Sequence, residues 1–295
     1  MTTYEIDGQY LKNNPLPLPQ GETDKDSRGR VIVVGGHREV PGGVLLAGVS
    51  ALRAGAGKVQ IATVESAAMG LAMALPEARV TGLPETESGD IAADNGARIE
   101  AMIQDEDAVL IGPGMLDDNH AGSLAATLLK TLDRVSIVLD AAALTGLRRD
   151  TDLVQRRAGH LVMTPHAGEM ATFLGIHRDE VIADPLGAAH RAAALTGSVV
   201  VMKGSCTHIV DAQGQASVCR HGNVGLATSG SGDTLAGIIV GLMAHGASPL
   251  LAAQWGVFIH AEAGERLRKR LGLLGYLARE IPAEIPGIME GLPPG

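Results

Sequence analysis

The sequence predicts an α/β protein built on a mostly parallel central sheet, and two observations carry this prediction. Short apolar runs rich in β-branched residues alternate along the chain with Ala-rich stretches of helical spacing, as in doubly wound folds. The chain is rich in Gly and apolar residues, yet it holds only two Phe, three Tyr and one Trp. Such a core must be filled by Ala, Val, Leu, Ile and Met, which is typical of strands buried on both faces.

The expected elements begin after a polar leader, residues 1–29, which we expect to be extended. Buried strands are predicted from short runs of β-branched residues at 31–34, 59–62, 108–111, 137–139, 161–163 and 199–202. Apolar spacing near 3.6 residues predicts helices between them, at 43–54, 92–104, 120–132 and 178–195. Two runs that flank a Gly-containing turn predict a β-hairpin at one sheet edge, at 207–211 and 216–220.

The last part of the chain is predicted to be helical, at 233–245 and 249–270, before a Pro-rich tail from 281. No break in composition marks a linker. Residues 1–295 are therefore predicted to form one domain.

The composition argues against several classes of partner. The net charge is −9, from 24 basic and 33 acidic residues, and few aromatic side chains are available to stack on bases, so we expect no nucleic-acid binding. The longest apolar run, 234–244, is shorter than the roughly 20 residues of a membrane span. No secretion signal is present. The two cysteines, Cys206 and Cys219, are expected to be small semi-buried side chains, and we expect a cytoplasmic protein.

Polar or Gly-rich segments follow most of the predicted strands. In an open α/β sheet, ligands bind at the carboxyl ends of strands, so these segments are where chemistry is expected. Together with the turn at 229–233 they should lie on one edge of the sheet. They are Gly35-Gly36-His37, Gly112-Pro113-Gly114, Asp140, Thr164-Pro165-His166 and Lys203-Gly204.

The strongest signal is the segment 222–233, which runs directly into an apolar helix. Its small residues should let the backbone N–H groups of Gly230, Ser231 and Gly232 gather around an anion, such as a phosphate in transfer. We expect the helix dipole to keep the Asp233 carboxylate ionised. Such a weak base would orient a hydroxyl and accept its proton late in phosphoryl transfer. The alternative is a plain N-cap behind a tight turn.

A wider set of motifs resembles the ribokinase-like superfamily and, within it, the ADP/ATP-dependent NAD(P)H-hydrate dehydratases, also called the YjeF C-terminal domain family. The Gly-Asp turn alone indicates only the superfamily. The ordered set indicates the dehydratases: Lys25 with Gly29-Arg30-Val31, Gly35-Gly36, Pro41-Gly42-Gly43, Arg53-Ala54-Gly55-Ala56-Gly57, Gly112-Pro113-Gly114, Leu139-Asp140-Ala141, Thr164-Pro165-His166-Ala167-Gly168-Glu169, Lys203-Gly204-Ser205-Cys206-Thr207 and Gly222-Asn223-Val224-Gly225.

The resemblance implies a three-layer α/β/α fold and an enzyme that repairs hydrated NADH or NADPH. ADP or ATP, with Mg²⁺, would phosphorylate the ring hydroxyl, and loss of phosphate would restore the dihydronicotinamide. The resemblance also implies a homotetramer and a separate epimerase for the hydrate. Carried over by position, the implied contacts are Asp233 with the substrate hydroxyl, Gly43, Gly114 and His166 with the hydrated dinucleotide, and Lys203, Gly204, Ser205, Cys206, Thr207 and Gly232 with the nucleotide.

The polar residues of these motifs each allow a second interpretation. His166 could be a surface or capping histidine. Glu169, three residues on, resembles the Glu that holds magnesium through water in small-molecule kinases, or it could complement a helix dipole. Lys203 could contact phosphate or sit in a structural ion pair, since an unpaired ammonium at the end of a buried strand is costly. Asp140 is expected to support the site rather than react.

Two positions depart from the family pattern. The family commonly has Ala where Gly43 stands, and it commonly has a second acidic residue where this chain has Ala142. Gly43 should preserve a backbone contact. Ala142 removes a charge near the site and weakens any prediction of metal binding there.

Two other functions remain open on the sequence alone. The first is a kinase of the same fold that phosphorylates a hydroxymethylpyrimidine, thiazole or pyridoxal alcohol. The second is a nucleotide-binding sensor without catalysis, although the intact turn and Asp233 argue against it.

Overall fold

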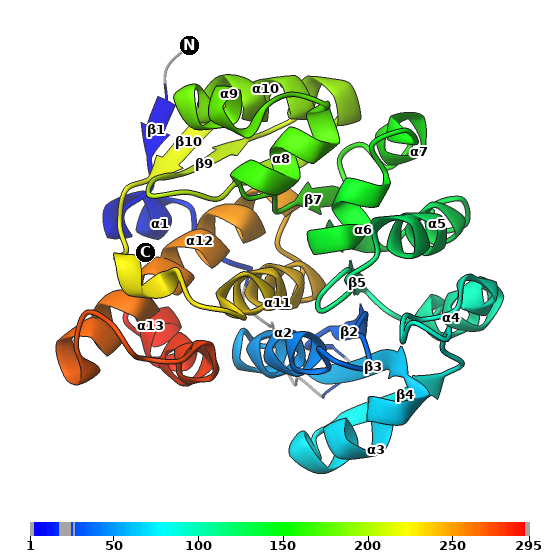
Figure 1. Cartoon of the computed structure of the whole chain (residues 1–295). Helices are drawn as coiled ribbons and strands as arrows, with labels where there is room; N and C mark the ends of the chain where they lie inside the picture. Colours follow the sequence, from blue (N-terminus) through cyan, green and yellow to red (C-terminus); the bar gives the residue numbers. More distant parts are fainter. Residues whose placement is uncertain (1–2, 18–24, 26, 293–295) are drawn as a thin grey trace.

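A central sheet flanked by two layers of helices organises the computed structural model, which describes residues 3–17, 25 and 27–292 (Figure 1). The sheet has ten strands among these residues: β1 (Thr3–Glu5), β2 (Arg30–Val34), β3 (Lys58–Val64), β4 (Ala78–Leu83), β5 (Ala108–Ile111), β6 (Ser136–Leu139), β7 (Leu161–Met163), β8 (Val199–Met202), β9 (Thr207–Val210) and β10 (Ala216–Cys219).

Helices fill most of the connections between strands. In chain order they are α1 (Gly8–Asn13), α2 (Gly42–Arg53), α3 (Glu65–Ala74), α4 (Gly96–Ile103), α5 (Asp118–Leu129), α6 (Ala141–Gly146), α7 (Thr151–Gln155), α8 (Ala167–Leu174), α9 (Arg178–Ala183), α10 (Pro185–Thr196), α11 (Ser231–Ala244), α12 (Pro249–Leu271) and α13 (Ile285–Glu290). Short 3-10 turns lie at η1 (Ala93–Asn95), η2 (Val224–Leu226) and η3 (Ala278–Glu284).

The strand order is β1-β10-β9-β8-β7-β6-β5-β2-β3-β4. Only the pairings of β9 with β8 and β10 are antiparallel among these strands. The order reverses between β2 and β5. In a sheet of this kind a ligand crevice forms at such a reversal, outside the carboxyl ends of the strands.

Alternate strand residues point to the two faces of the sheet and build two cores. In β2, Val31 and Val33 belong to the core shared with α2, α11, α12 and α13, while Ile32 and Val34 belong to the core shared with α4, α5, α8 and α10. All four valine and isoleucine side chains are fully buried. The continuous apolar run therefore reflects a strand covered on both faces, and the predicted three-layer α/β/α fold is confirmed (Figure 1).

The predicted strands and hairpin are present, but several details of the prediction are wrong. The hairpin β9–β10 does not form the sheet edge, because β1 pairs with β10 outside it. The described part of the leader is not simply extended, since it forms β1 and α1. The helix expected at 178–195 is two helices. Asp184 and Pro185 divide it, because Pro185 has no N–H to continue the first helix and Asp184 Oδ1 caps the second through Gly187 N–H at 2.8 Å.

Helices α2 and α11 pack with almost no side chain between them. A Cβ at Gly237 would lie 2.3 Å from the carbonyl oxygen of Ala47, and a Cβ at Gly241 would lie 2.7 Å from that of Ala51. This close contact fixes the start of α2, at Gly42-Gly43, relative to the start of α11. Both starts lie at the site described below.

The α2–α11 contact makes a testable prediction about stability. Gly237→Ala is expected to lower the free energy of unfolding by about 1–3 kcal/mol, because the new methyl group overpacks the contact. In α3 no atom lies within 4 Å of a Cβ at Gly70, so Gly70→Ala should raise stability by about 0.5–1 kcal/mol. Urea unfolding of both variants checks this. A gain for Gly237→Ala equal to that of Gly70→Ala would contradict the packing.

The N-terminal segment docks on α12. Trp255, which is 2% exposed, donates from Nε1 to the carbonyl oxygen of Asn14 at 2.8 Å. Gln254 donates to Tyr10 Oη at 3.0 Å and to Ser217 Oγ of β10 at 3.2 Å. Residues far apart in sequence are thus joined on one helix. No helix in the described part of the chain combines the length and apolar character that crossing a membrane requires.

Candidate active site

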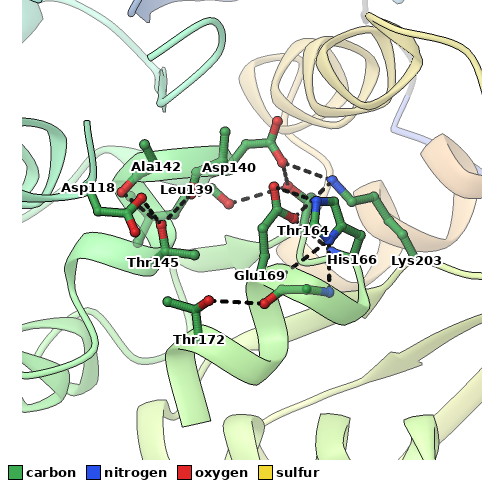
Figure 2. A network of polar contacts seen from close by, with 12 residues as sticks. Asp118, Leu139, Asp140, Ala142, Thr145, Thr164, His166, Glu169, Thr172 and Lys203 are labelled. Atoms are coloured by element: carbon green, nitrogen blue, oxygen red, sulfur yellow. Dashed lines mark hydrogen bonds and ion pairs between the residues drawn. The ribbon is translucent and has the colours of Figure 1, made fainter. Parts of the chain in front are cut away.

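A chain of polar contacts joins the carboxyl ends of β6, β7 and β8, and Figure 2 shows its members. Lys203, directly after β8, donates from Nζ to Asp140 Oδ1 at 3.1 Å, and the same Nζ lies 3.6 Å from Glu169 Oε2. Thr164, after β7, donates to Asp140 Oδ1 at 2.6 Å. Burial lowers the pKa of Lys203, but the carboxylates of Asp140 and Glu169 outweigh burial and hold that pKa above its usual value. Lys203 is therefore a charged ammonium paired with the carboxylates of Asp140 and Glu169.

The backbone at the end of β6 is unusual. Ala141 has φ 50°, the left-handed region that a residue with a side chain rarely adopts. Gly112, after β5, has φ 124°, and a Cβ there would lie 1.9 Å from the carbonyl oxygen of Asp140. This tight fit places the Asp140 carboxylate, which is 3% exposed, against Lys203. Ala142 is 7% exposed, so the position where the family commonly has an acid is a buried apolar one here.

The N-terminus of α11 meets the β5 loop and the start of α2. A Cβ at Gly43 would lie 2.7 Å from Gly114 N and 3.0 Å from Asp233 Oδ1. The Gly114 N–H donates a hydrogen bond to the Asp233 carboxylate. A Cβ at Gly232 would lie 3.3 Å from Lys203 Nζ. The fold thus brings Gly43, Gly114, Gly232, Asp233 and Lys203 together, as the position of the motifs on one sheet edge predicts.

The expectation that the helix dipole keeps Asp233 ionised is wrong. Burial and, after it, the nearby Asp140 carboxylate raise the pKa of Asp233 to about 7, although Lys203 and the Gly114 N–H both lower that pKa. A carboxylate with a pKa near neutrality can accept a proton from a reacting hydroxyl far better than an ordinary Asp. The Asp233 carboxylate is therefore more basic than that of an ordinary Asp.

The raised pKa also predicts how stability depends on pH. Folding raises the pKa of Asp233 from 3.8 to about 7, so the folded state binds more protons than the unfolded state between these values. The contribution of Asp233 therefore lowers the free energy of unfolding as the pH rises from about 4 to about 7. Asp233→Asn should raise the Tm of the protein at about pH 8 and leave it nearly unchanged at about pH 4. Calorimetry at both pH values tests this, and a lower Tm for the variant at the higher pH would refute it.

The backbone N–H groups available at the predicted anion site differ in part from those expected. Gly230 has φ 86° and precedes the first turn of α11. The N–H of Ser231 donates to the carbonyl oxygen of Thr228 at 3.2 Å, so this amide is already used. The N–H groups of Gly232 and Asp233 belong to the first turn, where a helix has no carbonyl partner of its own. These amides and the Lys203 ammonium form the cationic side of the site.

His166 and Glu169 form a capping box at the start of α8. His166 Nδ1 accepts from the N–H groups of Gly168 at 3.0 Å and Glu169 at 3.1 Å, and Glu169 Oε2 accepts from His166 N–H at 2.7 Å. The capping interpretation of both residues is therefore realised. It leaves the His166 side chain 59% exposed, and Nε2 lies 3.4 Å from Glu169 Oε1. Contacts of His166 with substrate and of Glu169 with magnesium stay predictions.

The loop between β8 and β9 carries the other residues predicted to line the nucleotide. Gly204 and Ser205 are exposed, while Cys206 and Thr207 are half-buried beside them. Cys206 Sγ lies 3.7 Å from Arg220 Nη1. Both cysteines are free thiols, and burial raises the pKa of Cys219 to about 11. The Cys219 thiol is therefore not poised to react at neutral pH.

Sequence reasoning missed the face of α12 that holds the segment 221–231. His221 pairs with Glu262 at 2.7 Å. Asn223 donates to Glu265 at 3.0 Å and accepts from Tyr276 Oη at 2.8 Å. Nearest to Asp233, Ser231 Oγ lies 2.9 Å from His260 Nε2. The spacing of polar residues in α12 indicates that they share one face of the helix. It does not show that this face contacts the segment 221–231, because that contact depends on how the helices pack.

Known proteins match this chain in sequence and in fold. A family model described as NAD(P)H-hydrate dehydratase matches residues 31–287. The ADP-dependent (S)-NAD(P)H-hydrate dehydratase of Xanthomonas campestris pv. campestris is 47% identical over 287 residues, which cover 97% of this chain and 96% of that protein. The bifunctional NAD(P)H-hydrate repair enzyme of Moorella thermoacetica is 35% identical over 94% of this chain and 52% of its own length, so the chain spans about half of it.

A solved structure extends the similarity to three dimensions. The ADP/ATP-dependent NAD(P)H-hydrate dehydratase from Bacillus subtilis, co-crystallized with ATP/Mg²⁺, matches with a TM-score of 0.81 and 26% identity, covering 99% of this chain and 100% of that chain. The family model, the sequence relative and the solved structure all carry the name NAD(P)H-hydrate dehydratase. The chain belongs to the NAD(P)H-hydrate dehydratase family.

Proposed function

We propose that this protein is an ADP-dependent (S)-NAD(P)H-hydrate dehydratase. The observation that carries the proposal is the Asp233 carboxylate, whose pKa is raised to about 7 by burial and which lies against Gly43 and Gly114 at the entrance of α11. The family and its relatives supply the substrate class.

The proposed reaction has two parts. The ring hydroxyl attacks the terminal phosphorus of ADP, its proton passes to Asp233, and AMP leaves. The phosphate then departs with the former hydroxyl oxygen, a neighbouring ring carbon loses a proton to solvent, and Asp233 gives up its proton to solvent. The ring double bond returns, giving NADH or NADPH. Asp233 needs to accept only one proton, and its pKa of about 7 suits that exchange near neutral pH.

The cationic side of the site would hold the transferred phosphate. Lys203 Nζ lies close to Gly232, and the first-turn amides of α11 face the same entrance. A helix N-terminus and an ammonium together favour the charge that gathers on a phosphoryl group in transfer. The exposed residues Gly204 and Ser205 would contact the rest of the nucleotide.

Magnesium would be held mainly by the nucleotide. The described residues contain no group of three or more His, Cys, Asp or Glu side chains arranged to hold a metal ion. Asp140 and Glu169 already lie against Lys203 Nζ, at 3.1 and 3.6 Å. Magnesium commonly keeps several waters and binds through phosphate oxygens, which fits so few protein ligands. Glu169 would reach it through a water.

The assay with hydrated NADH tests the function directly. The purified protein with hydrated NADH, ADP and Mg²⁺ should restore the absorbance of dihydronicotinamide and release phosphate, and ATP in place of ADP measures the preference. A stable phosphorylated product from a hydroxymethylpyrimidine, thiazole or pyridoxal alcohol would favour the kinase instead. Nucleotide binding without any turnover would favour the sensor.

We also propose a partner enzyme, an oligomeric state and a cellular compartment for this protein. A separate epimerase would work with this dehydratase, since only the S hydrate would be its substrate, and the Moorella thermoacetica relative is a bifunctional repair enzyme. A homotetramer in the cytoplasm remains the expected state. Light scattering of the purified protein would give its mass in solution.

A further inference from the structure

We propose that His260 is a positioning residue that directs the hydroxyl of Ser231 toward the transferred phosphate at the entrance of α11. This inference rests on the proposed function. It concerns two side chains of different helices: Ser231 is the first residue of α11, and His260 lies in α12.

The distances decide which nitrogen of His260 carries the proton. Nε2 of His260 lies 2.9 Å from Ser231 Oγ and 3.1 Å from the Ser231 carbonyl oxygen. A carbonyl oxygen can only accept a hydrogen bond. A bare Nε2 would therefore face the carbonyl with two lone pairs in contact. Nε2 must carry the proton, which it shares between the two oxygens of Ser231.

His260 stays neutral over the working range of pH. Burial lowers the pKa of His260 to about 4, and Lys203 acts in the same direction, while the bond to Ser231 acts against them. Neutral imidazole has one N–H, and Nε2 holds it. Nδ1 is then bare, and the ring is a fixed donor to Ser231 at neutral pH.

This arrangement leaves the hydroxyl proton of Ser231 available. Its oxygen receives the proton of His260, so the hydroxyl cannot also donate to that nitrogen. Ser231 is only 5% exposed, and within the described part of the chain its Oγ has no other hydrogen-bond partner. The Ser231 amide, meanwhile, is used by Thr228 at 3.2 Å. Ser231 thus serves the anion site through its hydroxyl rather than its amide.

The position of Ser231 at the start of α11 places its hydroxyl near the path of the transferred phosphoryl group. Ser231 precedes Gly232, whose Cβ position lies 3.3 Å from Lys203 Nζ, and Asp233, which takes the hydroxyl proton in the proposed reaction. A phosphoryl group moving between the nucleotide and the substrate passes this first turn. A donor that is polarised by His260 and already oriented adds to its stabilisation without rearrangement.

Four variants test the proposal in the dehydratase assay. Ser231→Ala and His260→Leu should each lower kcat roughly 10- to 100-fold, the worth of one hydrogen bond to a charged group, with smaller changes in KM for ADP. The double variant should be no slower than the worse single variant, because both remove the same interaction. His260→Gln should retain most of kcat, since its amide N–H can replace Nε2–H.

A matched control separates this effect from loop anchoring. Glu262 contacts the same loop from the same helix through His221, at 2.7 Å, and does not touch Ser231. Glu262→Gln should lower Tm but keep kcat. An equal loss of kcat in Glu262→Gln and His260→Leu would mean that His260 only anchors the loop and does not position Ser231. Independent, additive losses in the double variant, or a His260→Gln variant as slow as His260→Leu, would also overturn the proposal.

A binding experiment keeps the inference testable if the assay fails. Calorimetric titration with ADP and with AMP compares nucleotides with and without the phosphate that would be transferred. Ser231→Ala and His260→Leu should weaken ADP binding more than AMP binding. Equal weakening of both would overturn the role of Ser231, whatever the reaction. Absence of turnover in the wild-type protein, with the ADP-specific loss intact, would instead sink the proposed function alone.

Discussion

Asp233→Asn is expected to lower the kcat of hydrate dehydration by roughly 10²- to 10⁴-fold while ADP still binds. The amide keeps an oxygen that can accept the Gly114 N–H, so the local packing survives. It cannot take the proton of the attacking hydroxyl. Steady-state kinetics with hydrated NADH, together with calorimetric titration of ADP, separates loss of chemistry from loss of binding.

A matched control uses an aspartate at the start of another helix. Asp117 caps α5 by accepting from the N–H groups of Asn119 and His120, at 2.8 and 2.9 Å, and Asn is an equally good cap. Asp117→Asn makes the same change of charge and should keep full activity. If Asp233→Asn unfolds the protein, or keeps normal kcat, Asp233 is a cap and not a base.

Lys203→Met is expected to lower the free energy of unfolding by about 3–5 kcal/mol, the cost of leaving a buried charge without its partner. Asp140 is 3% exposed and would lose the ammonium at 3.1 Å. Urea unfolding measures this. Nucleotide binding should weaken as well, since the cationic side of the site is lost.

Two further variants make the Lys203 result specific. Asp140→Asn in the Lys203→Met background removes the stranded charge and should recover part of the lost stability. Lys130, on the surface after α5, has no ion pair among the described residues, so Lys130→Met should change stability by less than about 0.5 kcal/mol. No recovery in the double variant would mean that Lys203 contributes packing rather than charge.

The parts of the fold that sequence reasoning found are those with a strong local signal. The run at 31–34 is β-branched throughout and is buried on both faces, so its pattern could be recognised without knowing its neighbours. β4 (Ala78–Leu83) was missed because this edge strand mixes polar and apolar residues without a clear period. α3 was missed because its residues are almost all small or apolar, which also hides any helical period. The division of 178–195 was missed although Pro185 gave the signal.

The candidate site likewise has features that the sequence could predict and features that depend on tertiary packing. Its location could be predicted, because parallel strands place their carboxyl ends on one edge whatever the details of packing. The raised pKa of Asp233 could not be predicted, because it depends on burial by the fold and on Asp140, which is far away in sequence and follows β6. The same holds for Ser231 and His260, whose meeting requires α11 and α12 to pack.

The docking of the N-terminal segment on α12 gives the protein a built-in optical reporter. Trp255 is the single tryptophan of the sequence, and its indole is shielded from water while bound to Asn14. A red shift of its emission would therefore signal release of that helix or of the segment bound to it, with no label required. Because α12 also carries His260, nucleotide titrations and unfolding curves could be followed through one native fluorophore.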